Sequence, residues 1–208
     1  RQCRQAAMLD ANGDGMLDIV MVNHDQKNEW YVNDGSGSFV ESGDAAGFAD
    51  DGPARGLALL DFDGDGVLDV YVTQQNTRDL VYVVGVDGGG TTVFSEEGVA
   101  RGFADTDEFG IGVAGLDVSH DGDMDVIVGA VNERGKVWVN DGGRSFVEAG
   151  AAVGLVPSTA ITRAVVAADW DGDGDLDLVV VNLGTANRLY LNDGSGYFTE
   201  AGPMRGTA

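Results

Sequence analysis

A nine-residue acidic loop that occurs four times is the strongest constraint on this 208-residue chain. The copy in residues 61–69 reads DFDGDGVLD, with aspartates at positions 1, 3, 5 and 9 and a glycine at position 6. The other copies are residues 10–18 (DANGDGMLD), 117–125 (DVSHDGDMD) and 169–177 (DWDGDGDLD). Carboxylates at alternate positions of a tight turn converge, and a pair at 4 Å repels by roughly 4 kcal/mol at an effective dielectric of 20. Each loop is therefore expected to take up protons or to hold a cation.

Calcium is the cation that these loops are expected to bind. Oxygen donors favour Ca²⁺ or Mg²⁺ over softer metals, and a flexible loop suits Ca²⁺ better because Mg²⁺ demands octahedral geometry. Side chains at positions 1, 3, 5 and 9 and the backbone carbonyl at position 7 are the expected ligands. These residues are Asp10, Asn12, Asp14, Met16 and Asp18; Asp61, Asp63, Asp65, Val67 and Asp69; Asp117, Ser119, Asp121, Asp123 and Asp125; and Asp169, Asp171, Asp173, Asp175 and Asp177. Up to four Ca²⁺ ions are predicted, and the third site is expected to be the weakest because Ser119 replaces an aspartate.

An EF-hand begins with the same spacing of acidic residues, but the later residues of each loop exclude it. An EF-hand requires a glutamate at position 12 and a helix after the loop. Position 12 is apolar in all four copies, as Met21, Val72, Val128 and Val180. Each loop leads instead into a short aliphatic run that is typical of a strand.

The whole chain repeats in step with the loops. A segment of small apolar residues precedes each loop, an aliphatic segment follows it, and a third segment carries an aromatic residue. An Asn-Asp-Gly turn then follows in residues 33–37, 140–143 and 192–196, whereas the second repeat has a longer turn in residues 85–90. A short fourth segment is centred on a phenylalanine, as Phe39, Phe94, Phe146 and Phe198. Each repeat therefore predicts four antiparallel strands.

Repeats of this kind predict an all-β fold, a four-bladed β-propeller. Each blade is expected to be a four-stranded antiparallel sheet with a calcium loop between its first and second strands. A single domain is expected over residues 1–208, with blades at about residues 1–53, 54–109, 110–161 and 162–208. The last linker, residues 202–206, would either lie against the first blade and close the ring, or leave an open arc that belongs to a larger propeller or is completed by a second chain.

The combination of D-x-D-x-D-G-x-x-D, an aliphatic strand, an aromatic strand and N-D-G-x-G-x-F resembles the FG-GAP/VCBS repeat family, especially its CRTAC/ASPIC-like members. Related repeats form the propeller of integrin α-subunits and of some fungal lectins. The resemblance covers nearly the whole chain and implies a calcium-stabilised propeller. Its functional implication is broader, because the family includes adhesion proteins, lectins and a few enzymes. Two departures from the family pattern are Ser119 in the third loop and the missing Asn-Asp-Gly turn of the second repeat.

Composition narrows the classes of function. The net charge is −23, and the chain stays acidic even after four Ca²⁺ ions have supplied eight positive charges, so nucleic acid is not expected as a partner. No apolar run approaches the ~20 residues of a membrane-spanning helix, so direct membrane insertion is not expected either. The sequence has no G-x-S-x-G, Walker loop or H-E-x-x-H motif, so an enzyme is not the favoured interpretation.

A non-catalytic, calcium-stabilised binding module is therefore predicted, with a glycan or a protein as its partner. The expected location is extracellular or otherwise extracytoplasmic. A structural subunit docked in a larger complex is the alternative, and a propeller-fold lyase or hydrolase is the less favoured one. The ligand-binding residues and the oligomeric state do not follow from the sequence.

Two aromatic residues occupy position 2 of their loops, Phe62 in the second copy and Trp170 in the fourth. The favoured interpretation is that both rings pack beneath their loops. The alternative is that they are exposed as stacking surfaces for a sugar or a protein.

Overall fold

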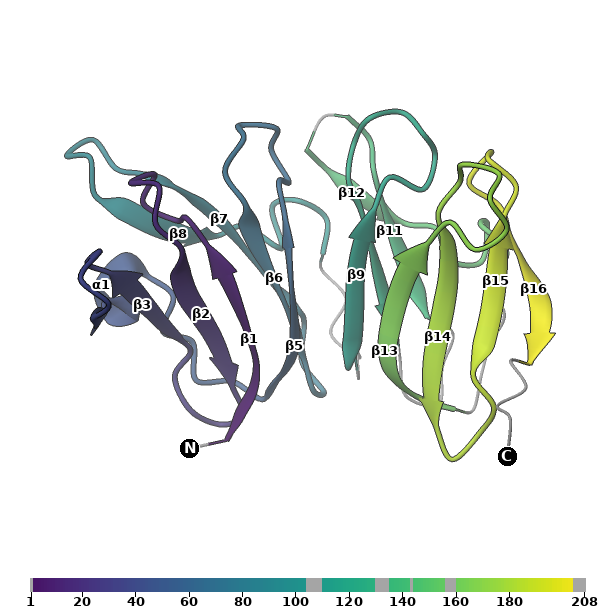
Figure 1. The fold of residues 1–208 in the computed structure, drawn as a ribbon, viewed down its shortest axis with the longest axis horizontal. Helices are drawn as coiled ribbons and strands as arrows, with labels where there is room; N and C mark the ends of the chain where they lie inside the picture. The colour runs from purple at the N-terminus through teal and green to yellow at the C-terminus, as the bar shows by residue number, and fades with distance from the viewer. Residues whose placement is uncertain (1, 104–109, 130–134, 143, 156–159, 204–208) are drawn as a thin grey trace. The chain divides into compact units, whose positions relative to one another are not determined.

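Strands dominate this computed structural model, which describes residues 2–103, 110–129, 135–142, 144–155 and 160–203. Within those ranges, four four-stranded antiparallel sheets are each built from four strands that pair in the order of the chain (Figure 1). One helix of four residues, α1 (Gly43–Ala46), follows the first sheet. No helix in the described ranges has the length and hydropathy needed to cross a membrane. The predicted all-β architecture of four sheets is confirmed.

The strands agree with the repeat in the sequence. The first sheet contains β1 (Cys3–Leu9), β2 (Asp18–Asn23), β3 (Glu29–Asn33) and β4 (Phe39–Glu41). The second contains β5 (Ala54–Leu60), β6 (Asp69–Gln74), β7 (Leu80–Val86) and β8 (Thr92–Glu96). The third contains β9 (Gly112–Leu116), β10 (Asp125–Gly129), β11 (Lys136–Asn140) and β12 (Phe146–Glu148). The fourth contains β13 (Ile161–Ala168), β14 (Asp177–Leu183), β15 (Arg188–Asn192) and β16 (Phe198–Pro203).

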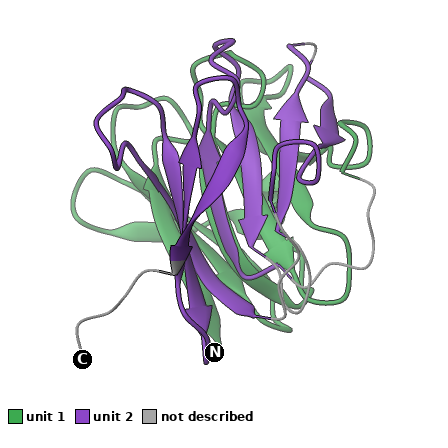
Figure 2. Ribbon diagram, turned by 90° about the vertical axis from the view of Figure 1, so that its right-hand side faces the viewer, with its two compact units in different colours: residues 1–108 green, residues 109–208 purple. Residues whose placement is uncertain are grey.

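The chain divides into two compact units (Figure 2). Unit 1, Arg1–Glu108, holds the first and second sheets, and unit 2, Phe109–Ala208, holds the third and fourth. The assignment of residues 1–208 to one domain, with its blade boundaries, stays a prediction.

In unit 1 the core lies between the two sheets. Trp30 of β3 and Phe94 of β8 are buried, and their ring centroids lie 5.3 Å apart. Phe48, which follows α1, lies 4.9 Å from the ring of Phe94 and 5.0 Å from the ring of Tyr82. Alternate residues of a strand face opposite sides of a sheet, so Val70 of β6 joins this core while its neighbours face the other way. Phe48, in the linker between the first and second sheets, thus packs in the core between them.

Unit 2 repeats this arrangement with smaller side chains. Ile127 and Val137 of the third sheet pack with Leu178, Tyr190 and Phe198 of the fourth. Leu155 lies at the place of Phe48 in the repeat and belongs to the same cluster.

The end of the described chain differs from the expectation. Gly202 and Pro203, predicted to begin the last linker, belong to β16 because they pair with Leu189 and Arg188 of β15. The other residues of that predicted linker, 204–206, lie outside the described residues, and the predicted ring closure stays untested.

Candidate metal sites

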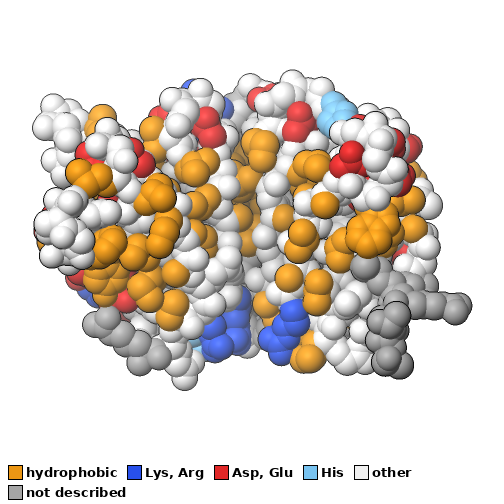
Figure 3. All heavy atoms as spheres, viewed as in Figure 1, with side chains coloured by type: hydrophobic (Ala, Val, Ile, Leu, Met, Phe, Trp, Pro, Cys, Tyr) orange, Lys and Arg blue, Asp and Glu red, His pale blue; other side chains and the backbone are white. Residues whose placement is uncertain are grey.

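The four acidic loops connect the first and second strands of their sheets, as the repeat predicts. In each unit these loops lie at one end of the sheets, where acidic side chains gather on the surface (Figures 1 and 3).

The aspartate at position 1 shapes each loop through its own backbone. In the second loop, Asp61 Oδ1 accepts hydrogen bonds from the N–H groups of Gly64 and Asp65 at 2.7 and 3.2 Å, and Oδ2 accepts one from Gly66 at 2.9 Å. Gly64 and Gly66 have φ of 72° and 89°, which residues with a side chain rarely adopt. Equivalent bonds to position 1 form in the other loops, through Asp10, Asp117 and Asp169.

Two loops bring three carboxylates together. The ligand atoms of each group lie within 4.8 Å of one another, and the groups are Asp61, Asp63 and Asp65 in the second loop and Asp169, Asp171 and Asp177 in the fourth. Hard oxygen donors gathered in a flexible loop are the donor set that Ca²⁺ prefers. The residues present in these two loops therefore fit a calcium ion.

The first and third loops have a mixed donor set. In the first loop the Asn12 amide donates to Asp14 Oδ2 at 2.9 Å. In the third loop, hydrogen bonds from the Asp123 N–H and from Ser119 lower the pKa of Asp121. Neither loop brings three acidic ligand atoms together within the described residues. The predicted weakness of the third site stays a prediction, as do the individual ligands.

A buried arginine lies beside the second loop. Arg101 follows β8 and is almost fully buried, and its Nη2 lies 2.9 Å from Glu97 Oε2 and 4.0 Å from Asp63 Oδ2. This cation offsets part of the charge of the Asp61, Asp63 and Asp65 group. Sequence patterns do not indicate this contact, because Arg101 is 38 residues from Asp63 along the chain but adjacent to it in space.

The aspartate at position 9 is fully buried in every loop. In the second loop, Asp69 Oδ2 accepts a hydrogen bond from the Phe62 N–H at 2.9 Å, and Oδ1 accepts one from the Val84 N–H of β7 at 2.8 Å. Asp125 and Asp177 accept the same pair of bonds in unit 2. Position 9 thus ties the loop to the third strand, a role that the expected ligand set does not include.

Burial raises the pKa of two of these aspartates, Asp69 and Asp125. Desolvation raises the pKa of Asp69 to about 7, although hydrogen bonds from Val84 and Phe62 oppose it, and the charges of Asp63 and Asp65 raise it further. Desolvation likewise raises the pKa of Asp125 to about 6. A cation held nearby would favour the charged carboxylates instead.

The side chain at position 7 packs beneath the turn between the third and fourth strands. At Gly35 a Cβ atom would lie 2.7 Å from Met16 Sδ, at Gly142 one would lie 3.0 Å from Asp123 Oδ2, and at Gly194 one would lie 2.5 Å from Asp175 Oδ2. The three glycines also have φ of 74–76°, which residues with a side chain rarely adopt, so glycine is favoured in the Asn-Asp-Gly turn. The Asp175 carboxylate also lies 3.3 Å from His120 Nδ1 of the third loop.

The asparagine of the Asn-Asp-Gly turn bridges that turn to the acidic loop. Asn192 Nδ2 donates to the Leu176 carbonyl at position 8 of the fourth loop (3.3 Å), and Asn192 Oδ1 accepts from the Gly194 N–H (3.2 Å). The same two bonds are made by Asn33 and Asn140. Val84 occupies this place in the second repeat, so its loop lacks the bridge.

The two aromatic residues at position 2 have different environments. Phe62 is 2 % exposed and packs near Tyr71 and Phe103, so the predicted packing is correct. Trp170 is 56 % exposed, so the prediction that it packs beneath its loop is wrong. The sequence shows the residue at this position but not whether another sheet covers it.

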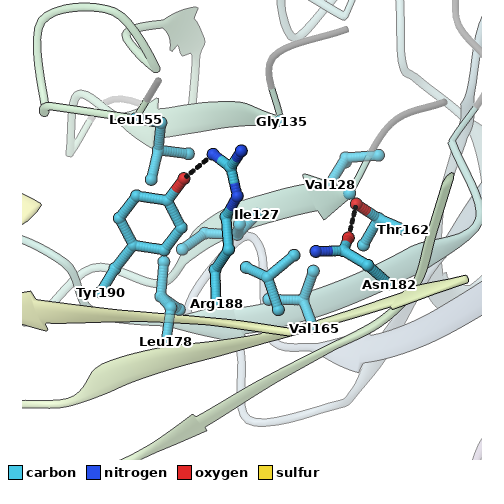
Figure 4. A pocket seen from close by; sticks show the side chains of 12 residues that line it. Ile127, Val128, Gly135, Leu155, Thr162, Val165, Leu178, Asn182, Arg188 and Tyr190 are labelled. Carbon is cyan, nitrogen blue, oxygen red and sulfur yellow. Dashed lines mark hydrogen bonds between the residues drawn. The ribbon is translucent and has the colours of Figure 1, made fainter. Parts of the chain in front are cut away.

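Each unit has a cavity among its described residues. In unit 2 a cavity of about 30 Å³ lies between the third and fourth sheets (Figure 4). Its polar groups pair with one another, because Arg188 Nη1 donates to Tyr190 Oη at 3.3 Å and Thr162 Oγ1 donates to Asn182 Oδ1 at 3.2 Å. That volume is of the order of one water molecule. In unit 1 a cavity of about 290 Å³ is lined by uncharged residues of the first acidic loop, β3, α1 and the start of β8, including Asn12, Trp30 and Thr91.

The repeat is recognised by a sequence profile. The profile of the FG-GAP-like repeat matches residues 10–72, 117–180 and 169–208. The chain belongs to the FG-GAP-like repeat family. The resemblance expected from the loops and turns is thereby confirmed, and FG-GAP-like repeat propellers generally serve as non-catalytic binding or structural modules.

Comparison with solved structures gives the fold of this FG-GAP-like repeat chain. It is similar to the β-propeller in the crystal structure of BBS1N in complex with ARL6DN, soaked with lead, with a TM-score of 0.57 and 11 % sequence identity. The match covers 96 % of this chain and 55 % of that one, so this chain spans about half the length of its structural relative. No curated protein matches the chain. The fold is that of a β-propeller with four four-stranded blades.

Proposed function

We propose that this FG-GAP-like repeat chain is a calcium-stabilised, non-catalytic module that binds a protein partner. The observation that carries the calcium assignment is the gathering of three carboxylates in each of the second and fourth loops. Asp61, Asp63 and Asp65 would hold one ion, and Asp169, Asp171 and Asp177 another. The first and third loops would bind further ions through their mixed oxygen donors. Bound calcium would neutralise repulsion within each loop and stabilise the chain.

Calcium titration tests this assignment. Isothermal titration calorimetry of the EDTA-treated chain is expected to show up to four bound Ca²⁺ ions, and calcium is expected to raise the melting temperature. Asp63→Asn should remove one binding event. Asp34→Asn is the matched control, because Asp34 lies in an exposed turn and its Oδ1 accepts bonds from Ser36 that an amide oxygen can also accept. A melting temperature that EDTA leaves unchanged, with no calcium uptake, would refute the proposal.

A protein partner is favoured by one comparison. The similar BBS1N structure is a complex with another protein, ARL6DN. A glycan partner, the other expectation from the sequence, has no comparable support. Binding of the calcium-loaded chain to extracts before and after glycosidase treatment separates the two. Saturable binding that survives the treatment supports a protein partner, whereas loss of binding on glycan removal contradicts it.

An extracytoplasmic location is part of the same proposal. Calcium sites in extracellular modules commonly have dissociation constants of about 10⁻⁴–10⁻³ M, which suits loops with mixed donors. Dissociation constants far below this range in all four loops would instead favour a compartment with little free calcium.

A further inference from the structure

Arg101 places a permanent positive charge beside the second acidic loop. Its Nη2 lies 4.0 Å from Asp63 Oδ2, and its Nε and Nη2 each lie 2.9 Å from Glu97 Oε2. All three residues belong to unit 1. An arginine stays protonated at any pH at which a protein is folded, so this charge is always present. The guanidinium therefore acts on a carboxylate of the candidate calcium site whether or not the site is loaded.

The linker after β8 holds Arg101 in this place. The Arg101 N–H donates to the Glu97 carbonyl at 2.9 Å, which fixes the backbone of the linker. Phe103 follows two residues later, and its buried ring lies 5.4 Å from the ring of Tyr71 and 6.4 Å from the ring of Phe62. Phe62 is position 2 of the second loop, directly before the aspartate at position 3. The aromatic contacts thus hold the linker against the loop.

The linker residue and position 3 of the loop vary together among the four repeats. The motif F-x-E-x-G-x-x-X-G occurs in every repeat, and Arg101 is its residue X in the second. Position 3 and residue X are Asn12 with Ala46, Asp63 with Arg101, Ser119 with Val153, and Asp171 with Arg205. The structure of Arg205 lies outside the described residues. In the sequence, an arginine occurs where position 3 is an aspartate, and an uncharged residue occurs where it is not.

The first repeat shows the same place without an arginine. Asn12 and Ala46 both line the cavity of about 290 Å³ in unit 1. The short side chain of Ala46 leaves space beside an uncharged position 3, whereas Arg101 reaches Asp63 in the second repeat. The length and charge of Arg101 therefore match the additional charge of Asp63.

Hydrogen bonds other than those of Arg101 shape the second loop. Asp61 accepts bonds from three N–H groups of the loop at 2.7–3.2 Å. Asp69 accepts one from the Phe62 N–H and one from the Val84 N–H of β7. Loss of the guanidinium should therefore change the electrostatic potential at the loop more than its backbone.

We propose that Arg101 is a built-in counter-cation that sets the calcium affinity of the second loop. Without calcium, the guanidinium offsets the repulsion among Asp61, Asp63 and Asp65 and stabilises the folded loop. A metal cation at the same carboxylates is repelled by the guanidinium, so calcium uptake there is weakened. Loss of the charge is expected to strengthen calcium binding and to destabilise the calcium-free chain. This inference rests on the calcium assignment proposed above.

Calorimetric titration of the 208-residue chain with calcium tests the effect on affinity. Arg101→Met removes the charge, keeps much of the length, and is expected to lower the dissociation constant of one site about tenfold or more. Arg101→Lys keeps the charge and should leave that constant close to its original value. Arg78→Met is the matched control, because it changes the net charge equally and Arg78 pairs with Glu96 at the other end of β6 from the second loop.

A second substitution assigns the affected site to the second loop. Asp63→Asn removes the carboxylate that Arg101 contacts, so adding Arg101→Met to it should leave the remaining calcium sites unchanged. The same two substitutions give a calcium-free test by urea denaturation in EDTA. Asp63→Asn should be more favourable to stability in the Arg101→Met chain than in the unaltered chain, because only the former has lost the cation that offsets the Asp63 charge.

The outcomes separate this inference from the calcium assignment. Calcium binding with every dissociation constant unchanged by Arg101→Met overturns the inference and leaves the assignment intact. If neither chain takes up calcium, the assignment is refuted and the predicted effect on affinity is refuted with it. Additive effects of the two substitutions in EDTA refute the counter-cation itself.

Folding of each variant is checked by circular dichroism. If Arg101→Met alone does not fold, Arg101→Met combined with Glu97→Gln takes its place in every measurement. The combination removes both members of the 2.9 Å ion pair, so no carboxylate is left there without its cation.

Discussion

The buried aspartates at position 9 hold the repeat together at the scale of single residues. Asp69 uses both carboxylate oxygens for backbone N–H groups, one in its own loop and one in β7. Hydrogen bonds to charged groups contribute about 1.5–3 kcal/mol each, more than bonds between neutral groups. The position is therefore structural before any ion binds.

Replacing Asp69 by Asn is expected to lower the free energy of unfolding by about 2–3 kcal/mol, because an amide NH₂ then faces a backbone N–H donor. Urea denaturation in EDTA, at a pH above the Asp69 pKa of about 7 so that its carboxylate is charged, measures this effect apart from calcium. Asp87→Asn is the control, since Asp87 Oδ1 accepts bonds from Gly89 and Thr91 in an exposed turn and an amide oxygen can replace it. Equal effects of the two substitutions would contradict this role of Asp69.

The bridging asparagines give a second test at this scale. Asn192 is 3 % exposed and joins its turn to the fourth loop, so Asn192→Ala should cost about 1–3 kcal/mol by leaving buried polar groups unpaired. Asn33→Ala removes the same two bonds at a more exposed site and should cost less. Thermal unfolding of both variants ranks them, and the reverse order would show that burial does not set the cost.

At the scale of elements, the strands follow from the sequence more readily than the contacts between them. Aliphatic and aromatic residues at regular spacing predict all four strands of each repeat, because the same pattern returns four times. Phe62 and Trp170 occupy one position of the repeat, yet one is covered and the other exposed. Arg101 reaches the second loop only through folding. Sequence gives the chemistry of a side chain, whereas its neighbours come from packing between sheets.

A forked ion pair fastens β8 to the segment before β7. Arg78 Nη1 and Nη2 donate to Glu96 Oε1 and Oε2 at 2.8 and 2.7 Å. Burial of Glu96 raises its pKa, but the hydrogen bonds from Arg78 and from the Gly98 N–H outweigh it, so the pKa is lowered. A lowered carboxyl pKa stabilises the fold above its ordinary value of 4.5, and the stabilisation is lost as the pH falls through the folded pKa.

The pH dependence of the Arg78–Glu96 pair can be measured as the difference in stability between the unaltered chain and an Arg78 variant. Arg78→Gln is expected to reduce stability by about 1 kcal/mol at pH 7. The difference from the unaltered chain should shrink as the pH falls from 4.5 through the lowered folded pKa of Glu96, because below that pKa Glu96 is protonated in both proteins. Urea denaturation at several pH values measures it, with Lys27→Gln as a control at the more exposed pair with Asp44. A difference that persists in acid would show that Arg78 stabilises through packing alone.

At the scale of the whole molecule, calcium bound to the four repeats would increase the stability of the chain. A site at ten times its dissociation constant adds about 1.4 kcal/mol, so four sites would add roughly 5–6 kcal/mol. That is comparable with the whole net stability of a domain, about 5–15 kcal/mol. The sequence predicts the loops and their donors, but it does not predict which carboxylates converge, since backbone bonds within each loop decide that.

The order of calcium affinity among the four sites is also testable at this scale. The third loop is expected to bind calcium most weakly, so Ser119→Ala should lower the melting temperature in calcium less than Asp173→Ala does. Differential scanning calorimetry in calcium and in EDTA compares them. Ser119→Asp serves as the gain-of-function partner and is expected to strengthen the third site. A larger loss from Ser119→Ala than from Asp173→Ala would reverse the order.

The turn between β7 and β8 is a suitable place to insert a peptide. It lacks the asparagine that elsewhere anchors this turn to an acidic loop, and residues 87–91 are exposed and closed by their own hydrogen bonds. Exposed turns with few outside contacts accept insertions best. A short tag or a dye-labelling peptide placed there would leave the second loop intact. Thr91 also lines the larger cavity of unit 1, so such a label would report directly on anything that enters it.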